Sequence, residues 1–394
     1  VNVLDLQKNV PNLLISKGAV NTPIVTMRGV GRIAVSGTAS PGVGIHVNGV
    51  PVVDGRFFET EFYDTERIEA LRGPQGTLYG RNTVGGVLNF ISAKPEADLG
   101  GEIDIQLGNY NTRRVRGVLN LPLTGNLSTR LAGFSLQRDG YTENLHDGND
   151  VDDRDMFSLR WTTSLQMGEA TDATFMLHYF EEDDQRARGD NQSCKKDPAG
   201  VLGCLPGLGD EHLHSGATIY GFVTSTFGGG SFPVDDYANS ARPSGLREVS
   251  MDYSPSYYAE ETIATLEFNH DFGELKLTSL TGYVEGNFDA SYDGDTTVAS
   301  EPWPVEVTMA LPNGQAPITV DRMYVVDQSA LENEQWSQEF RLASSFEGDL
   351  NFLLGLFWLD YEAVEDRHWY NSATAWAGQL LGLSEREQIF GADI

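Results

Sequence analysis

The stretch of sequence that decides the fold is Asp64-Thr-Glu-Arg-Ile-Glu-Ala-Leu-Arg-Gly-Pro-Gln-Gly-Thr-Leu-Tyr-Gly-Arg-Asn-Thr-Val-Gly-Gly-Val-Leu-Asn-Phe-Ile-Ser-Ala-Lys-Pro95. Five glycines in so short a span indicate backbone that packs too closely for side chains or that adopts positive φ. We expect a short acidic helix turn at the start of the stretch and a strand that ends at Leu71. A Gly-Pro turn and a tight glycine-rich loop then lead into a buried strand from Gly86 to Ser92.

A glycine-rich loop can also bind phosphate, so the nucleotide-binding motifs need to be tested. A P-loop has Lys and then Ser or Thr after its second glycine, but Gly80 is followed by Arg81-Asn82. A dinucleotide fingerprint must open a helix, whereas Val84 to Ile91 reads as a strand. The sequence also contains no Gly-x-Ser-x-Gly elbow and no His-Glu-x-x-His pair, so it does not predict an enzyme.

Beyond Lys94-Pro95 the sequence changes to a regular alternation of apolar and polar residues. Phe157, Leu159 and Trp161, for example, alternate with polar neighbours. This period of two predicts strands that have one apolar face. Nine such strands are expected, near residues 101–108, 112–121, 128–138, 154–166, 172–182, 257–270, 274–288, 335–346 and 350–362.

The lengths of the connections between these strands distinguish two all-β architectures, an outer-membrane barrel and a soluble sandwich. After a short first turn at 109–111, long and short connections alternate, and the long ones are 139–153, 183–256 and 289–334. An outer-membrane barrel has short turns at one end and long loops at the other, whereas a soluble sandwich has no reason to do so. The rhythm therefore predicts a transmembrane antiparallel β-barrel. A soluble β-rich binding or adhesion protein is the alternative.

The composition excludes some classes of function. The chain has 27 basic and 57 acidic residues and a net charge of −30, which argues against a nucleic-acid partner because phosphate contacts need clustered Lys and Arg. The longest apolar run, Leu353 to Leu359, is too short for a spanning helix, so a membrane protein with this sequence must be a barrel. The chain opens on Val1-Asn2-Val3 without a signal peptide, as expected for a mature form or a fragment.

Several loop residues have alternative interpretations. Cys194 and Cys204 would form a disulfide in an oxidising compartment, and otherwise they are two free thiols. The acidic runs 147–155 and 289–295 contain the oxygen ligands that Ca²⁺ prefers, but neither has EF-hand spacing, and solvated loops are the favoured interpretation. His212 and His214 form an isolated pair that is better explained as surface than as a metal site. We expect no resident metal or cofactor.

The stretch from Glu66 to Pro95 resembles the end of the plug domain of TonB-dependent outer-membrane receptors. Met27-Arg-Gly-Val-Gly31 is similar to the Arg-Gly element of that plug, and Gly42 to Pro51 is similar to the strand and turn that follow it. Trp336 to Leu342 and Leu353 to Trp358 look like the family's barrel strands. The residues that carry the plug motif are Gly73, Pro74, Gly76, Tyr79, Gly80, Arg81, Asn82, Gly85 and Gly86.

The resemblance implies an N-terminal α+β plug domain, residues 1–97, inside the lumen of a barrel whose first part is residues 98–394. Barrels of this family have about 22 strands, and about nine strands are too few to enclose a plug. We therefore expect the chain to be a fragment of a longer receptor. The resemblance also implies the outer membrane of a Gram-negative bacterium, contact with its lipid, and coupling to the periplasmic protein TonB through a box upstream of Val1.

The implied function is energy-dependent uptake of a bulky, scarce small-molecule nutrient, with a ferric siderophore expected first and a carbohydrate or another nutrient as the alternative. Arg28 and Arg72 match plug arginines that face barrel glutamates in the family. Glu339 alternates with Phe340, so if Phe340 faces lipid then Glu339 faces the lumen and is the expected partner. Local pairing within the plug is the alternative for each arginine. The candidates for substrate contact in the apical loops are Tyr220, Trp303 and Tyr324.

Overall fold

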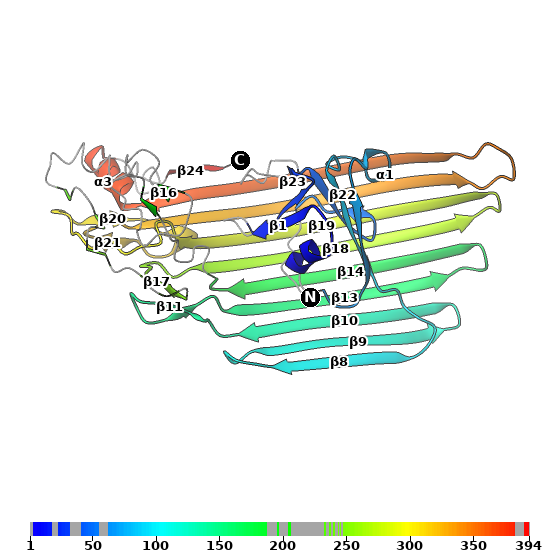
Figure 1. The fold of residues 1–394 in the computed structure, drawn as a ribbon, viewed down its shortest axis with the longest axis horizontal. Helices are drawn as coiled ribbons and strands as arrows, with labels where there is room; N and C mark the ends of the chain where they lie inside the picture. The colour runs from blue at the N-terminus through cyan, green and yellow to red at the C-terminus, as the bar shows by residue number, and fades with distance from the viewer. Residues whose placement is uncertain are drawn as a thin grey trace.

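The structure is a computed structural model, and it describes residues 3–17, 23–31, 41–54, 62–186, 195–196, 204–205, 232–233, 236–237, 239–240, 243, 245, 247–382 and 390–393. It has two parts, and in the view of Figure 1 the first, in blue, overlaps the second. The plug segment comprises the described residues up to 97, and the wall is the large antiparallel sheet that follows.

The plug segment contains two small sheets. The first is antiparallel and is preceded by a 3-10 helix, η1 (Val3–Lys8); its strands are β1 (Leu13–Lys17), β2 (Pro23–Met27) and β3 (Val30–Gly31). The second has the order β5-β4-β7-β6, with β4 (Val43–Val47), β5 (Val50–Pro51), β6 (Thr65–Arg72) and β7 (Gly86–Ser92). Strands β4 and β7 are parallel, and the other neighbours in this sheet are antiparallel.

The glycine-rich stretch folds largely as its sequence predicts. The buried strand from Gly86 to Ser92 is confirmed, and six of its seven residues are buried. The helix turn expected at Asp64 is wrong, because β6 begins at Thr65 and pairs with β7 along its length. A helical turn occurs later instead, as α1 (Gly76–Tyr79) inside the loop. Pairing with a buried strand outweighs the weak helix preference of a short segment.

The wall is a ten-stranded sheet with the order β24-β23-β22-β19-β18-β14-β13-β10-β9-β8. Its strands are β8 (Gly100–Leu107), β9 (Arg113–Thr124), β10 (Leu127–Arg138), β13 (Arg154–Gln166), β14 (Thr171–Asp184), β18 (Ser256–Asp271), β19 (Leu275–Asp293), β22 (Val325–Ser344), β23 (Leu353–Asn371) and β24 (Phe390–Asp393). The nine predicted strands are all present, and β24 adds a short tenth. The eighth starts at Val325 rather than 335 and the ninth ends at Asn371 rather than 362, because their pairing continues past the apolar alternation.

The two faces of the wall differ in polarity. On β13, Phe157, Leu159 and Trp161 are each more than 40% exposed, while Ser158 and Arg160 between them are buried toward the plug segment. Outward apolar residues on the other long strands include Ile103, Ile105, Leu119, Leu131, Leu177, Leu266, Trp336, Phe340, Leu354, Leu356 and Trp358. A sheet face of this kind suits lipid on one side and a polar lumen on the other. Among the described residues, no helix is long and apolar enough to cross a membrane.

The long connections all lie at one end of the wall, on the left of Figure 1, and four short ones lie at the other end. The long loops carry small elements: β11 (Thr142–Asn144), β12 (Asp150–Val151), β15 (Lys195–Lys196), β16 (Cys204–Leu205), β17 (Glu248–Val249), β20 (Val307–Met309), η4 (Pro312–Gly314), β21 (Ile318–Val320) and α3 (Ser372–Leu380). The predicted alternation of short turns and long loops is therefore confirmed.

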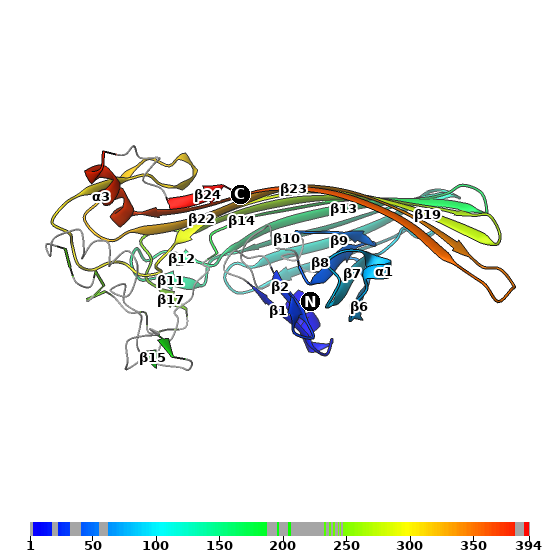
Figure 2. The same ribbon diagram turned by 90° about the horizontal axis from the view of Figure 1, so that it is seen from above.

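The plug segment lies against the inner face of the curved wall (Figure 2). Val47 and Phe90 of the plug segment share one buried cluster with Met176, Ile263 and Val284 of strands β14, β18 and β19. The two parts therefore share a core, and burying apolar area is what first holds them together.

Candidate functional site at the plug–wall interface

The strongest polar contact between the two parts is made by Asp64, the first residue of the quoted stretch. Its two carboxylate oxygens accept hydrogen bonds from Arg130 on β10, with Nε 3.0 Å from both oxygens and one terminal nitrogen 2.5 Å from Oδ1. Arg160 on β13 lies 3.5 Å from Oδ2 and donates to the backbone oxygens of Tyr63 and Asp64. The Asp64 side chain is 4% exposed. Charge-assisted, two-point pairing of this kind is strong and directional.

Tyr63 extends the same contact onto a third strand. Its hydroxyl lies 2.6 Å from Oγ of Ser158, which in turn is 2.8 Å from Nε2 of His178 on β14. The Tyr63 ring stacks on Phe134 of β10, with the centroids 6.0 Å apart. Burial raises the pKa of Tyr63, an effect that nearby Arg160 opposes. We call these plug residues and their wall partners on β10, β13 and β14 the Tyr63–Asp64 clamp.

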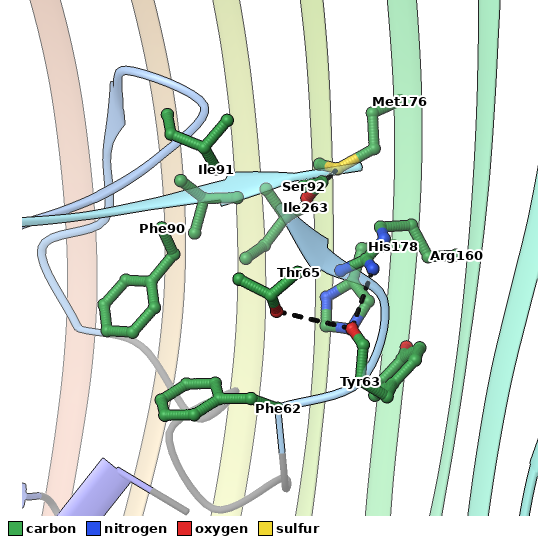
Figure 3. Close-up of a pocket in the computed structure, with 11 residues that line it drawn as sticks. Phe62, Tyr63, Thr65, Phe90, Ile91, Ser92, Arg160, Met176, His178 and Ile263 are labelled. Carbon is green, nitrogen blue, oxygen red and sulfur yellow. Dashed lines mark hydrogen bonds between the residues drawn. The ribbon is translucent and has the colours of Figure 1, made fainter. Parts of the chain in front are cut away.

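A small cavity of about 40 Å³ adjoins the clamp. Figure 3 shows Tyr63, Arg160 and His178 converging on one side of it. Its lining residues are Val47, Phe62, Tyr63, Thr65, Phe90, Ile91, Ser92, Arg160, Met176, His178 and Ile263. Both parts of the protein contribute, so the cavity is a feature of the plug–wall interface.

Among the described residues, two polar contacts join the plug segment to strands β18 and β22, and both are weaker than the clamp. Others join Asn48 and Ser92 to Met176 of β14 and the backbone of Glu96 to Asn120 of β9. The amide side chain of Gln335, on β22, accepts from the backbone N–H of Val53 at 3.1 Å and donates to the oxygen of Pro51 at 2.5 Å. Lys94 lies 3.5 Å from Glu267 on β18, and the lysine side chain is half exposed. Neutral amide bonds and exposed ion pairs each contribute little compared with a buried two-point pair.

The glycines of the plug motif sit where the backbone is crowded or left-handed. Gly86 has φ +153, and a Cβ there would overlap Met27 and the backbone oxygen of Leu71. Gly73 and Gly80 also have positive φ, and Asn82 adopts φ 63. A Cβ on Gly85 would lie 3.1 Å from Val30. Both physical reasons for glycine therefore occur in this loop.

The other motif residues have varied settings. The Tyr79 ring packs edge-on against His46, with the centroids 5.1 Å apart. Gly76 opens α1, and Pro74 and Arg81 are exposed. Burial lowers the pKa of His46 to about 4.

The structure does not bring the three predicted cluster residues into an ion pair. Glu339 pairs with Arg341 on its own strand, at 3.1 Å. Arg28 and Arg72 are exposed, and within the part of the chain that the structure describes neither forms an ion pair. Their role in plug–barrel contact stays a prediction. The wall contact that sequence reasoning missed has the opposite polarity: the plug supplies the carboxylate, and the wall supplies the arginines.

A signal for that contact was present in the sequence. Arg160 stands between Leu159 and Trp161, so the alternation places it on the lumenal face of β13. A charged residue at such a position needs a partner, because an isolated charge facing a packed lumen is costly. The partner could not be named from sequence, since the position of the plug along the strands is a tertiary property.

The loop candidates divide between described and undescribed residues. Trp303 is 5% exposed, and its indole N–H donates to Asp236 at 2.7 Å. It belongs to a buried cluster that includes Phe232, Met309 and Trp376, which we call the loop cluster. Tyr324 is half-buried, and its hydroxyl donates to the backbone oxygen of Asp252. Tyr220, Cys194, His212 and His214 lie outside the described residues, and Cys204 is described only by its backbone. Among the described residues, no three His, Cys, Asp or Glu side chains are grouped to hold a metal ion.

Comparisons with known proteins identify the two parts. The family model of the TonB-dependent Receptor Plug Domain matches residues 1–87. The chain is 32% identical over 88 residues to the pesticin receptor of Yersinia pestis, covering 22% of this chain and 13% of that protein. It is 40% identical over 76 residues to the ferrioxamine B receptor of Salmonella typhimurium, covering 19% and 11%.

Solved receptors extend the likeness over the wall. The ferric yersiniabactin uptake receptor from Yersinia pestis matches 93% of this chain with a TM-score of 0.55 at 14% identity, and the ferripyoverdine receptor of Pseudomonas aeruginosa matches 94% with 0.56 at 14%. At these identities the likeness establishes the fold. The chain spans 58% and 41% of those two receptors, so it corresponds to about half of their length. The family model therefore identifies residues 1–87 as a TonB-dependent receptor plug domain, and the wall that follows has the fold of part of a receptor barrel.

Proposed function

We propose that the protein takes up a ferric siderophore across the outer membrane by TonB-coupled transport. The observation that carries the proposal is the plug segment, which is folded and clamped against the lumenal face of a wall whose other face is apolar. A plug held in this way blocks the lumen, so a bulky solute passes only when something moves the plug. Coupling to an energy-transducing partner such as TonB supplies that movement.

The proposed substrate class rests on the relatives. The names of the ferrioxamine B receptor and of the ferric yersiniabactin uptake receptor both refer to iron chelates. The Vibrio cholerae relative, 29% identical over 157 residues, is an iron-regulated outer membrane virulence protein. Resemblance to several iron-related receptors favours an iron chelate over a carbohydrate. The apolar outer face of the wall disfavours the alternative of a soluble binding protein.

Uptake of labelled iron tests the proposal. A strain lacking this gene, its complemented form and a tonB deletion would each be given ⁵⁵Fe-loaded ferrioxamine B, yersiniabactin or pyoverdine at nanomolar concentration. We expect at least one chelate to enter only when both this protein and TonB are present. Uptake of labelled maltodextrin that depends on the two genes, without uptake of any chelate, would favour the carbohydrate alternative and refute the siderophore assignment.

A further inference from the structure

We infer that the Tyr63–Asp64 clamp stays closed during transport and is the fixed attachment about which the rest of the plug segment swings away from the wall. The inference rests on the proposed transport function and names which contact of the interface persists. It assigns to Asp64, Arg130 and Arg160 a conformational role, that of positioning the plug segment.

The first argument is the difference in strength between the contacts. Asp64 is almost fully buried and is paired with two arginines, and Arg160 also binds two backbone oxygens. Opening this contact would leave one carboxylate and two guanidinium groups without partners in a poorly hydrated interface. Opening the contact at Gln335 breaks only neutral hydrogen bonds, and opening Lys94–Glu267 separates a partly exposed pair. A force on the plug segment therefore breaks the contacts at Gln335 and Glu267 first.

The second argument is the position of the contacts along the wall. The two arginines lie on the neighbouring strands β10 and β13, whereas Gln335 lies on β22, with β14, β18 and β19 in between. The contacts therefore lie far apart across the sheet. A rotation about the clamp opens the widest gap near β22 and the smallest near β10.

The third argument is the surface that the plug segment meets near β22. Val50 packs onto Gly282 of β19, where a Cβ would overlap the valine side chain. Glycine presents bare backbone and no side chain that could interlock with the plug. On the clamp side, by contrast, the Tyr63 ring is stacked on Phe134, and its hydroxyl joins the Ser158–His178 pair. One side of the interface is held by a buried ion pair and a stacked ring, whereas the other is held by neutral hydrogen bonds and by packing on bare backbone.

Reversible cross-linking tests the inference, and it is carried out on the receptor as encoded by its gene. Cys194 and Cys204 are first replaced by serine. One variant then carries Asp64→Cys with Arg130→Cys, and the matched variant carries Val53→Cys with Gln335→Cys. Both pairs are joined by a short bis-methanethiosulfonate reagent, because the replaced side chains span more than a direct disulfide. Uptake of the ⁵⁵Fe chelate that the wild type transports is measured before cross-linking, after it, and after reduction.

We expect the 64–130 cross-link to leave uptake within twofold of wild type, and the 53–335 cross-link to lower it at least tenfold, with recovery on reduction. Loss of uptake in the 64–130 variant that reverses on reduction would overturn the inference, as would full uptake through the cross-linked 53–335 variant. Recovery on reduction in the same cells separates a blocked movement from a failure to fold.

A second measurement does not depend on transport. Asp64→Asn removes the charge that holds both arginines, whereas Asp64→Glu keeps it. We expect the Asn variant to admit vancomycin through a loosened plug and to lower the inhibitory concentration at least fourfold, with the Glu variant close to wild type. Equal resistance of the two variants would contradict the clamp. Failure of the wild type to take up any chelate would refute the proposed function but leave this comparison intact.

Discussion

Acidification should destabilise the plug segment through one histidine. His46 lies in β4, is 2% exposed and packs edge-on against Tyr79. Burial lowers its pKa to about 4, and a hydrogen bond to the backbone of Tyr79 offsets this only in part. Its Nδ1 has no hydrogen-bond partner among the described residues. Within the part of the chain that the structure describes, no carboxylate is paired with this side chain to stabilise an imidazolium.

The sign and size of the effect follow from linkage. The folded plug keeps His46 neutral down to about pH 4, whereas the unfolded segment binds a proton near its ordinary pKa of 6.5. The stability due to neutral His46 is therefore complete above pH 6.5 and is lost as the pH falls toward 4. At pH 5 the loss is about 2 kcal/mol, which corresponds to roughly a 30-fold change in an equilibrium constant.

Hydrogen exchange of β4 amides, corrected for the intrinsic rate at each pH, measures this loss. In the detergent-solubilised receptor we expect the protection of residues 43–47 to fall by roughly 30-fold between pH 7.5 and 5. His46→Phe keeps a ring beside Tyr79 but cannot be protonated, so the fall should disappear. The control variant His146→Phe changes an exposed loop residue and should keep the fall. An equal fall in the His46→Phe variant would refute the reasoning.

Three more predictions address the packing, the loops and the membrane face. Gly86→Ala should destabilise the plug segment by about 1–3 kcal/mol through overlap with Met27 and speed its proteolysis, whereas Gly125→Ala, with no neighbour within 4 Å, should not. Burial, and after it the charge of Asp252, raises the pKa of Asp293, at the loop end of β19, to about 7, so the loop cluster should lose stability as the pH rises from about 4 through 7. Asp293→Asn should flatten this profile in limited proteolysis, and an unchanged profile would count against it. Trp161→Arg should cost about 2–4 kcal/mol if the site faces the bilayer midplane and should lower the heat-modifiable folded fraction on gels. The control is Glu181→Arg, at a position of β14 that already carries a charge, and equal folding of the two proteins would contradict the lipid-facing assignment.

The strands of the wall could be predicted from the sequence because the two faces of each strand have different surroundings. Lipid on one side and a polar lumen on the other require a period of two, and Phe157, Leu159 and Trp161 follow it. The same rule failed at the loop ends of β22 and β23, where the regular alternation stops although pairing with the neighbouring strand continues. Alternation therefore locates the apolar band better than it locates the ends of the strands.

The plug contacts were less predictable. The crowding that requires glycine at Gly86 is local and follows from the motif, but the pairing of Asp64 with Arg130 and Arg160 joins residues 66 and 96 positions apart. No local pattern encodes such a pair. Trp303 shows the same limit, because the sequence does not distinguish an aromatic side chain packed inside a loop cluster from one that faces solvent.

The length of the strands sets the distance of the loop cluster from the membrane. Strands β19, β22 and β23 have 19, 20 and 19 residues, whereas about 9–11 tilted residues cross a bilayer. At about 3.3 Å per residue, the remaining roughly eight to eleven residues continue the sheet for about 30 Å along the strands beyond the apolar band. A stiff, hydrogen-bonded extension of the sheet therefore carries the outer loops. The length of this extension sets the distance between the loops and the lipid.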